Sequence, residues 1–227
     1  MKVALLGKGK TGGLVRELHG EKNTTVFDRS NPVSEEKLLG HDVIISFLPA
    51  DAFISSMQIL MNSRIPVVSG STGDIPIEKI HEELLKRSLT WIHGNNFSLA
   101  MTLLRSMLQK LGKITQLDGF ELSLSETHHS QKLDAPSGTA KSWKAWLGVD
   151  SVKINSLREG DVIGIHSVVA QSSFEKVTLT HEALDRKLFA QGALWAAQQI
   201  YRGSPMQAGL ESFQSFVARE IKLEENS

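Results

Sequence analysis

The side chains best suited to acid-base chemistry are concentrated in one short stretch, residues 126–140, which reads ETHHSQKLDAPSGTA. Two adjacent histidines, His128 and His129, are followed by Lys132. Imidazole titrates near neutrality, and an ammonium group close by can donate a proton or hold a carboxylate. We therefore expect proton transfer at His128 and Lys132, while a purely structural cluster stays open as the alternative.

The two histidines end an alternating stretch in which Phe120, Leu122 and Leu124 are separated by polar residues, as in a half-buried strand. If this strand continues through the pair, His128 and His129 point to opposite faces and have separate roles. The chain contains no cysteine and no His-Glu-x-x-His motif, so we expect no metal site.

The segment Pro136-Ser137-Gly138-Thr139 has the form of a loop that enters a helix. Ser137 can cap the helix, and Gly138 exposes amide groups. Such a helix end can bind an anion, for example a substrate carboxylate. A plain helix cap explains these residues equally well.

A glycine-rich loop, residues 7–13 (GKGKTGG), follows the apolar run at residues 3–6 and precedes a stretch with helical spacing. In such a loop Gly7 supplies a tight turn, Gly9 lets the backbone approach a pyrophosphate, and Gly12 or Gly13 allows close packing of helix on strand. The loop predicts binding of a dinucleotide.

Asp28 lies 21 positions after Gly7, close to the offset of about 20 at which an acidic side chain accepts a hydrogen bond from a ribose hydroxyl. Arg29 beside it can instead receive a 2′-phosphate. The sequence therefore leaves open the choice between NADH and NADPH. Lys8 and Lys10 either attract the phosphates or are ordinary surface lysines.

The first half of the chain alternates strands and helices, the pattern of a Rossmann-like doubly wound parallel sheet in an α/β protein. We expect its strands at residues 3–6, 24–27, 42–48, 67–68 and 91–92. Two turns follow such strands and are placed to reach the same cofactor, Gly70-Ser71-Thr72 and Gly94-Asn95-Asn96-Phe97. Routine turns are the competing explanation for both.

The pattern changes after Phe97. A helix at residues 99–111 is followed by the alternating strand that leads to His128, and strands at residues 162–169 and 174–180 follow one another without a helix between them. This order predicts a second α+β domain built on a mostly antiparallel or mixed sheet. A last helix is expected at residues 188–201.

The amino-acid composition limits the kinds of partner that we expect. Twenty-five basic residues balance 25 acidic ones, so we expect no nucleic-acid partner and no polybasic membrane anchor. The N-terminal apolar run is far shorter than the roughly 20 residues of a membrane span. The absence of cysteine is compatible with a reducing compartment, and we expect a cytoplasmic protein with a small-molecule substrate.

The stretch at residues 126–140 closely resembles the signature of the 4-hydroxy-tetrahydrodipicolinate reductase family, enzymes of lysine biosynthesis. Further segments look like family landmarks in family order: the glycine loop, GSTGD at residues 70–74, NNFS at 95–98, GIHS at 164–167 and RKLFAQGA at 186–193. The resemblance implies NAD(P)H-dependent reduction of a cyclic dicarboxylate, with loss of water, on the route to diaminopimelate and lysine.

The resemblance also implies roles for single residues. His128 would be the acid-base histidine and Lys132 the proton donor, with His129, Ser137, Gly138 and Thr139 at the substrate carboxylates. The residues implied to hold NADH or NADPH are Gly7, Lys8, Gly9, Lys10, Thr11, Gly12, Asp28, Arg29, Gly70, Ser71, Thr72, Gly94, Asn95, Asn96 and Phe97.

By the same resemblance, residues 1–97 and 187–227 form the dinucleotide-binding domain, and residues 98–186 form a substrate domain that assembles a homotetramer through its sheet. Three departures stand out. GST replaces the usual GTT, Ala100-Met101-Thr102 replaces the end of an FSxGxN motif, and the segment between the Ser137 helix and Arg186 is short. The rival interpretations are another two-domain nicotinamide-dependent oxidoreductase, such as an amino-acid or semialdehyde dehydrogenase, and a non-catalytic nucleotide sensor.

Overall fold

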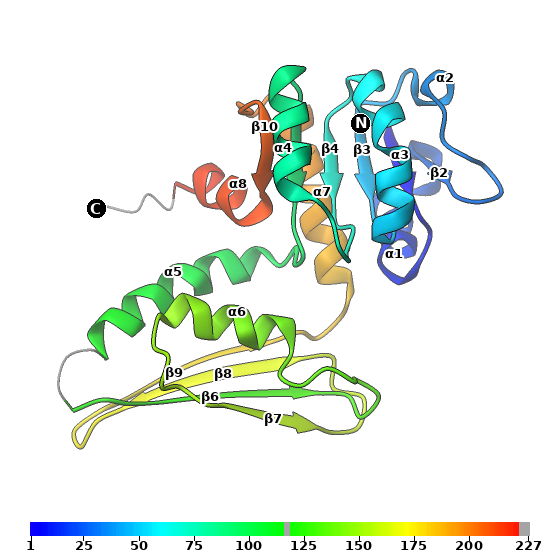
Figure 1. Cartoon of the computed structure of the whole chain (residues 1–227). Helices are drawn as coiled ribbons and strands as arrows, with labels where there is room; N and C mark the ends of the chain where they lie inside the picture. The colour runs from blue at the N-terminus through cyan, green and yellow to red at the C-terminus, as the bar shows by residue number, and fades with distance from the viewer. Residues whose placement is uncertain (116–118, 223–227) are drawn as a thin grey trace. The chain divides into compact units, whose positions relative to one another are not determined.

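The computed structural model describes residues 1–115 and 119–222 and contains two compact units (Figure 1). Unit 1 comprises Met1–Met101 together with Lys187–Ser227, and unit 2 comprises Thr102–Arg186. The expected domain ranges include residues 116–118 and 223–227, which lie outside the described part. Among the described residues, no helix combines the length and the apolar character needed to cross a membrane.

Unit 1 is built on a six-stranded sheet in which every pair of neighbours is parallel. Its strands, in spatial order, are β10 (Gly209–Ser212), β5 (Thr90–His93), β4 (Val67–Ser69), β3 (Val43–Ser46), β1 (Val3–Leu6) and β2 (Thr24–Phe27). All five strands expected in the first half of the chain are present, and β10 at the edge was not expected. The Rossmann-like fold class is confirmed.

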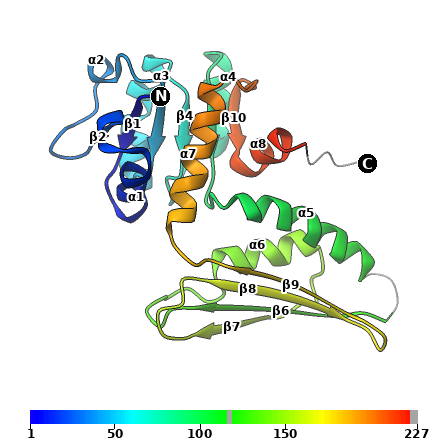
Figure 2. The same cartoon turned by 180° about the vertical axis from the view of Figure 1, so that it is seen from behind.

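Helices cover both faces of this sheet, as the two opposite views show (Figures 1 and 2). On one side lie α1 (Lys10–His19), α7 (Lys187–Tyr201) and α8 (Phe213–Glu220), and on the other α2 (Glu35–Leu38), α3 (Ala50–Ser63) and α4 (Ile77–Lys86). Side chains alternate along each strand, so Val43 and Ile45 enter one core while Ile44 enters the other. Four buried alanines let α7 approach the sheet closely: Ala190, Ala193, Ala196 and Ala197.

Unit 2 contains a mixed sheet, as the sequence predicted, and the sheet has four strands, of which β7 was not expected. Its strands are β7 (Ile154–Arg158), β6 (Glu121–His128), β8 (Ile165–Gln171) and β9 (Lys176–Glu182), in that spatial order. β6 pairs with β7 in parallel, whereas the other two pairs are antiparallel.

One face of the unit 2 sheet carries α6 (Gly138–Leu147) and α5 (Leu99–Ile114), whose residues from Thr102 onward belong to this unit (Figure 1). The two helices pack tightly at Gly112, where a Cβ atom would lie 1.8 Å from the Leu147 carbonyl oxygen. α6 also packs on β6, the strand that carries the histidine segment.

Candidate active site

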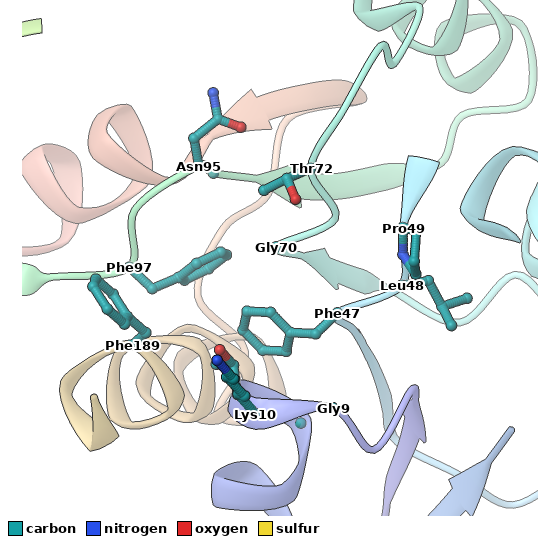
Figure 3. Close-up of a pocket in the computed structure, with 13 residues that line it drawn as sticks. Gly9, Lys10, Phe47, Leu48, Pro49, Gly70, Thr72, Asn95, Phe97 and Phe189 are labelled. Carbon is teal, nitrogen blue, oxygen red and sulfur yellow. The ribbon is translucent and has the colours of Figure 1, made fainter. Parts of the chain in front are cut away.

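Unit 1 holds a cavity of about 400 Å³ at the carboxyl ends of its parallel strands (Figure 3). The loops after β1, β3, β4 and β5 line it, and Phe189 of α7 completes the wall. Ligands of open α/β sheets bind at this edge. The residues that were expected to hold a dinucleotide and that line the cavity are Gly9, Lys10, Thr11, Gly12, Gly70, Thr72, Gly94, Asn95 and Phe97.

The glycine loop has the backbone that a phosphate cradle requires. Gly7 has φ +89°, and a Cβ atom on Gly12 would lie 2.0 Å from the Gly7 carbonyl oxygen, so α1 can approach β1 only with glycine there. A Cβ atom on Gly9 would meet nothing within 4 Å, because that position faces open space. No side chain caps the start of α1, which leaves its first amides available to an anion. These residues fit a pyrophosphate.

Aromatic side chains form the apolar part of the cavity, where Phe47, Phe97 and Phe189 gather on one side (Figure 3). The Phe47 and Phe97 rings meet edge to face at 5.9 Å. A Cβ atom on Gly70 would lie 2.2 Å from the Phe47 ring, so the glycine makes room for it. Phe47 was not predicted from the sequence, although it directly follows β3 just as other cavity residues follow their strands.

Asp28 and Lys8 form an ion pair with 2.7 Å between Nζ and Oδ2. The lysine, followed by hydrogen bonds from Ser30 and Asn31, holds the pKa of the Asp28 carboxyl well below its usual range. These two residues follow β2 and β1, beside the exposed Arg29, and none of the three lines the cavity. The acidic residue expected at a ribose is thus already paired with a cation.

Other expected cofactor residues turn their side chains elsewhere. Ser71 is fully buried, and its hydroxyl shares a hydrogen bond of 3.0 Å with the Ser46 hydroxyl. Asn96 accepts a hydrogen bond from the Ser98 amide at 2.9 Å. Neither residue lines the cavity, and Gly7 does not line it either. Their contribution is to the shape of the turns.

In unit 2 the alternation of β6 continues to its last residue and places Leu124, Glu126 and His128 on the buried face. The pairing of β6 with its two neighbours brings two more residues to this face. His166 of β8 lies opposite Glu126, and Arg158 of β7 lies beside His128. A cluster of charged and polar side chains thus forms beneath α6.

Glu126 is the centre of this cluster and is only 1% exposed. Its Oε2 accepts a very short hydrogen bond from His128 Nδ1, and its Oε1 accepts from Arg158 Nη1 at 3.0 Å and from the Ser137 amide at 3.4 Å. Burial raises the pKa of Glu126, but the Ser156 hydroxyl, Arg158 and His128 lower it further than burial raises it. The carboxylate is therefore ionised at neutral pH.

His128 is held neutral near pH 7 by its surroundings. Burial lowers its pKa, the Glu126 carboxylate opposes this, and Lys132 and Arg158 add to the lowering. Because Nδ1 faces a carboxylate, it carries the hydrogen, and Nε2 is the free basic nitrogen. A Cβ atom on Gly164 would lie 3.0 Å from Nε2, so only glycine leaves this nitrogen uncrowded.

Lys132 lies in the loop after β6, where its Nζ is 2.6 Å from Oδ1 of Asp134. The pairing with Lys132 is the largest influence holding the pKa of Asp134 below its ordinary value. His129 is half-buried and its carbonyl accepts from the Lys132 amide at 3.1 Å, which closes the turn. His128 and Lys132 thus come from one strand end and the turn that follows it.

The start of α6 is capped by Ser137, whose Oγ accepts from the Ala140 amide at 3.1 Å and pairs with His166 Nε2 at 3.1 Å. Ser137 is 2% exposed, so its hydroxyl is directed inward. The amides of Gly138 and Thr139 have no partner within the helix. Anion binding at this end therefore depends on those two amides.

His166 was not assigned a role from the sequence. Its ring contacts His128 edge to face with 5.0 Å between centroids, and burial, followed by the positive charge of a protonated His128, lowers its pKa to about 4. Ligand-type atoms of Glu126, His128 and His166 lie within 4.8 Å of one another. The Arg158 guanidinium bonded to Glu126 opposes a metal cation at this place.

The fold and these two sites define a class: a Rossmann-type α/β protein whose second unit carries a histidine-lysine site on a mixed sheet. The model of the family described as "Dihydrodipicolinate reductase, C-terminus" matches residues 98–213. A 4-hydroxy-tetrahydrodipicolinate reductase of Christiangramia forsetii is 33% identical over 220 residues, covering 88% of this chain and 92% of the relative. The chain belongs to the 4-hydroxy-tetrahydrodipicolinate reductase family.

A further relative agrees with this assignment, and a solved structure shares the fold. The reductase of Stenotrophomonas maltophilia is 33% identical over 166 residues, with 72% of this chain and 69% of the relative covered. The dipicolinate-bound dihydrodipicolinate reductase from Paenisporosarcina sp. TG-14 has the same fold, with a TM-score of 0.74 at 19% identity over 93% of this chain and 97% of that one.

The departure at Ala100-Met101-Thr102 has a visible consequence. Thr102 is 4% exposed, and within the described residues its hydroxyl has no hydrogen-bond partner.

Proposed function

We propose that this chain reduces 4-hydroxy-tetrahydrodipicolinate to tetrahydrodipicolinate with NADH or NADPH, in the biosynthesis of diaminopimelate and lysine. One hydride and one proton are added to the ring, and one water molecule is lost. The observation that carries the proposal is the hydrogen-bonded chain Arg158–Glu126–His128 beside Lys132, in which Glu126 and His128 are buried, in a member of this reductase family. We place such a soluble biosynthetic activity in the cytoplasm.

The nicotinamide cofactor belongs in the cavity of unit 1. Support comes from the uncapped start of α1, the open space at Gly9 and the aromatic wall at Phe47. When bound, NADH or NADPH supplies the hydride. The chain's own contribution is to hold the phosphates with loop amides and to exclude water from the apolar side of the cavity.

The proton comes from the histidine-lysine site. A neutral His128 with Nε2 free can accept a proton or relay one, whereas the Lys132 ammonium has a proton to give to the electron-rich ring position. We therefore assign donation to Lys132 and acid-base assistance to His128. The substrate carboxylate that approaches Lys132 competes with Asp134 for the ammonium.

Besides proton transfer, the site must bind the two carboxylates of the substrate. We assign these contacts to His129 and to the free amides of Gly138 and Thr139, because charge-assisted hydrogen bonds to carboxylates are strong. Ser137 acts through the helix cap, since its hydroxyl is committed to Ala140 and His166.

A homotetramer formed through the unit 2 sheet is part of the proposal. The face of the sheet away from α6 carries mainly uncharged side chains, among them Ser123, Ser125, Thr127, Val169 and Thr180. The charged residues of this face, Glu121, Lys176 and Glu182, lie at the ends of their strands, so its centre can pair with another copy at little desolvation cost. Light scattering of the purified protein tests this directly, with a monomer as the result against it.

A steady-state assay tests the reaction. The wild-type protein should oxidise NADH or NADPH in the presence of freshly generated 4-hydroxy-tetrahydrodipicolinate, and no oxidation would reject the proposed function. His128→Gln and Lys132→Ala should each lower kcat by about 100-fold or more, the usual cost of a lost acid-base group, and retain cofactor binding. Lys141→Ala, an exposed lysine of the same unit, is the matched control.

A further inference from the structure

Arg158, the last residue of β7, connects parts of unit 2 that are far apart in the sequence. Its Nη1 donates to Glu126 Oε1 at 3.0 Å, its Nε donates to the Lys132 carbonyl at 3.3 Å, and its Nη2 donates to the Asp134 carbonyl. One planar guanidinium thus reaches the carboxylate below His128 and the backbone of the loop that carries Lys132.

The loop has little else to hold it at that point. Leu133 lies between the two bonded carbonyls and is 98% exposed, so no apolar packing fixes this segment. The turn bond from the Lys132 amide to the His129 carbonyl, and the bond from the Ser130 amide to the Gly160 carbonyl, both lie on the side of the loop nearer β6. The far side depends on Arg158.

We propose that Arg158 and Glu126 are positioning residues that hold His128 and Lys132 in a fixed relative geometry. Glu126 orients the imidazole through Nδ1, and Arg158 holds both Glu126 and the carbonyls of the Lys132 loop. The inference rests on the proposed function only in taking His128 and Lys132 as the groups that transfer the proton.

A lysine at position 158 cannot bond to Glu126 and to the loop carbonyls at the same time. Its ammonium is a single point of charge on a flexible stem. The planar guanidinium of Arg158 instead donates in different directions, to Glu126 and to the carbonyls of Lys132 and Asp134, besides the carbonyl of its neighbour Leu157. Arg158→Lys therefore keeps a positive charge next to the buried Glu126 and removes the connection to the loop. This variant separates positioning from charge balance.

The strands and the loop packed against His128 contribute the charged and titratable groups that face it. They are Glu126 on β6, Lys132 in the following loop, Arg158 on β7 and His166 on β8, with His181 of β9 behind His166. α6 contributes the uncharged Ser137 and Trp143 next to His166. Glu126 raises the pKa of His128, and Arg158 lowers it.

Two measurements on the full-length protein test the proposal. The first is kcat for Glu126→Gln and Arg158→Lys, with Arg219→Lys as control, because Arg219 makes a comparable two-bond contact with Glu211 in unit 1. The second is the pKa of His128 from NMR titration of histidine-labelled protein, with the signal assigned by its absence in His128→Gln. This second measurement uses Arg158→Met in place of Arg158→Lys, because the methionine removes the positive charge beside His128.

We expect kcat to fall about 100-fold in Glu126→Gln and Arg158→Lys, as for a small displacement of reacting groups, and to stay at the wild-type level in Arg219→Lys. The pKa of His128 should fall in Glu126→Gln and rise in Arg158→Met. Wild-type turnover in Arg158→Lys, or shifts of the same sign in both variants, would overturn the proposal.

A low kcat in a single variant could also come from a loss of stability, and a double variant separates the two causes. The double variant Glu126→Gln/Arg158→Met leaves no unpaired buried charge, so it should recover stability relative to either single variant but retain the low kcat. Recovery of kcat with stability would show a structural role alone. If wild-type protein oxidises no cofactor but the opposite pKa shifts appear, the proposed function fails and the orientation of His128 by this pair stands.

Discussion

Lys8 and Asp28 are joined across the first β–α–β segment, with the lysine ammonium 2.7 Å from the carboxylate. An acidic residue at this place usually accepts hydrogen bonds from a ribose and repels a 2′-phosphate. Pairing with Lys8 reduces that repulsion while both carboxylate oxygens stay charged. We therefore expect this loop to accept both NADH and NADPH.

Variants of the pair should separate the two cofactors. Asp28→Ala should weaken NADH binding by about 10-fold, the size expected for a lost hydrogen bond to a charged group, and weaken NADPH binding less. Lys8→Ala should weaken NADPH binding most, because it exposes the Asp28 charge to the 2′-phosphate. Calorimetric titration with each cofactor measures this, and equal losses for both cofactors in Lys8→Ala would contradict it.

Two glycines of the same loop should respond differently to alanine. Gly12→Ala places a Cβ atom 2.0 Å from a backbone oxygen, so we expect a loss of about 1–3 kcal/mol in the free energy of unfolding together with weaker cofactor binding. Gly9→Ala meets nothing within 4 Å and should retain stability while it obstructs the pyrophosphate. Denaturant unfolding and cofactor titration on both proteins distinguish the two effects.

The cap of α6 gives a prediction with an internal control. Ser137→Ala removes the acceptor for the Ala140 amide and should cost about 1 kcal/mol of stability, as should Ser212→Ala at the start of α8, where Ser212 accepts from the Ser215 amide. KM for the substrate should change little in Ser137→Ala. A large rise in KM without loss of stability would show that the hydroxyl contacts the substrate.

Buried neutral histidines make unit 2 sensitive to acid. The pKa of His166 is about 4 in the folded protein and 6.5 for the ordinary side chain, so the unfolded chain binds the extra proton more readily. The stability from this group is therefore complete above about pH 6.5 and is lost as the pH falls toward 4, by up to about 3 kcal/mol.

Removal of the ring should flatten this dependence. We expect the unfolding free energy of His166→Gln to change less between about pH 7 and pH 4.5 than that of the wild type. The pKa values of His128 and His181 are also lowered by burial, so part of the acid sensitivity should persist. Denaturant curves at several pH values are the measurement, and parallel curves for both proteins would refute the assignment to His166.

The sequence predicted the interior of each sheet better than its edges. β1 and β3 are continuous apolar runs because both of their faces are buried, and that pattern is readable without a structure. The two strands that were not expected, β7 and β10, lie at the edges of their sheets and contain polar residues. Backbone pairing fixes these two strands and leaves no mark in the hydrophobic pattern, whereas the other two edge strands, β2 and β9, were expected from the sequence.

The candidate site divides in a similar way. His128, Lys132 and the cap at Ser137 were predicted because they lie within one short, chemically distinctive stretch. Arg158 and His166 join them only through the register of β7 and β8 on β6, and the register between distant strands cannot be read from one sequence. The residues that hold the histidine were therefore the ones that were missed.

Unit 1 is assembled from two separated parts of the chain, since β10 pairs with β5 and α7 supplies the alanine surface under β1 and β3. During synthesis the first 101 residues leave the ribosome without these partners, with one edge strand and much of one helical layer missing. At ordinary translation rates the gap before residue 187 lasts about 4–17 s. During that interval the apolar face of the nascent sheet that α7 later covers is exposed. Chaperones that bind exposed apolar segments can bind this face.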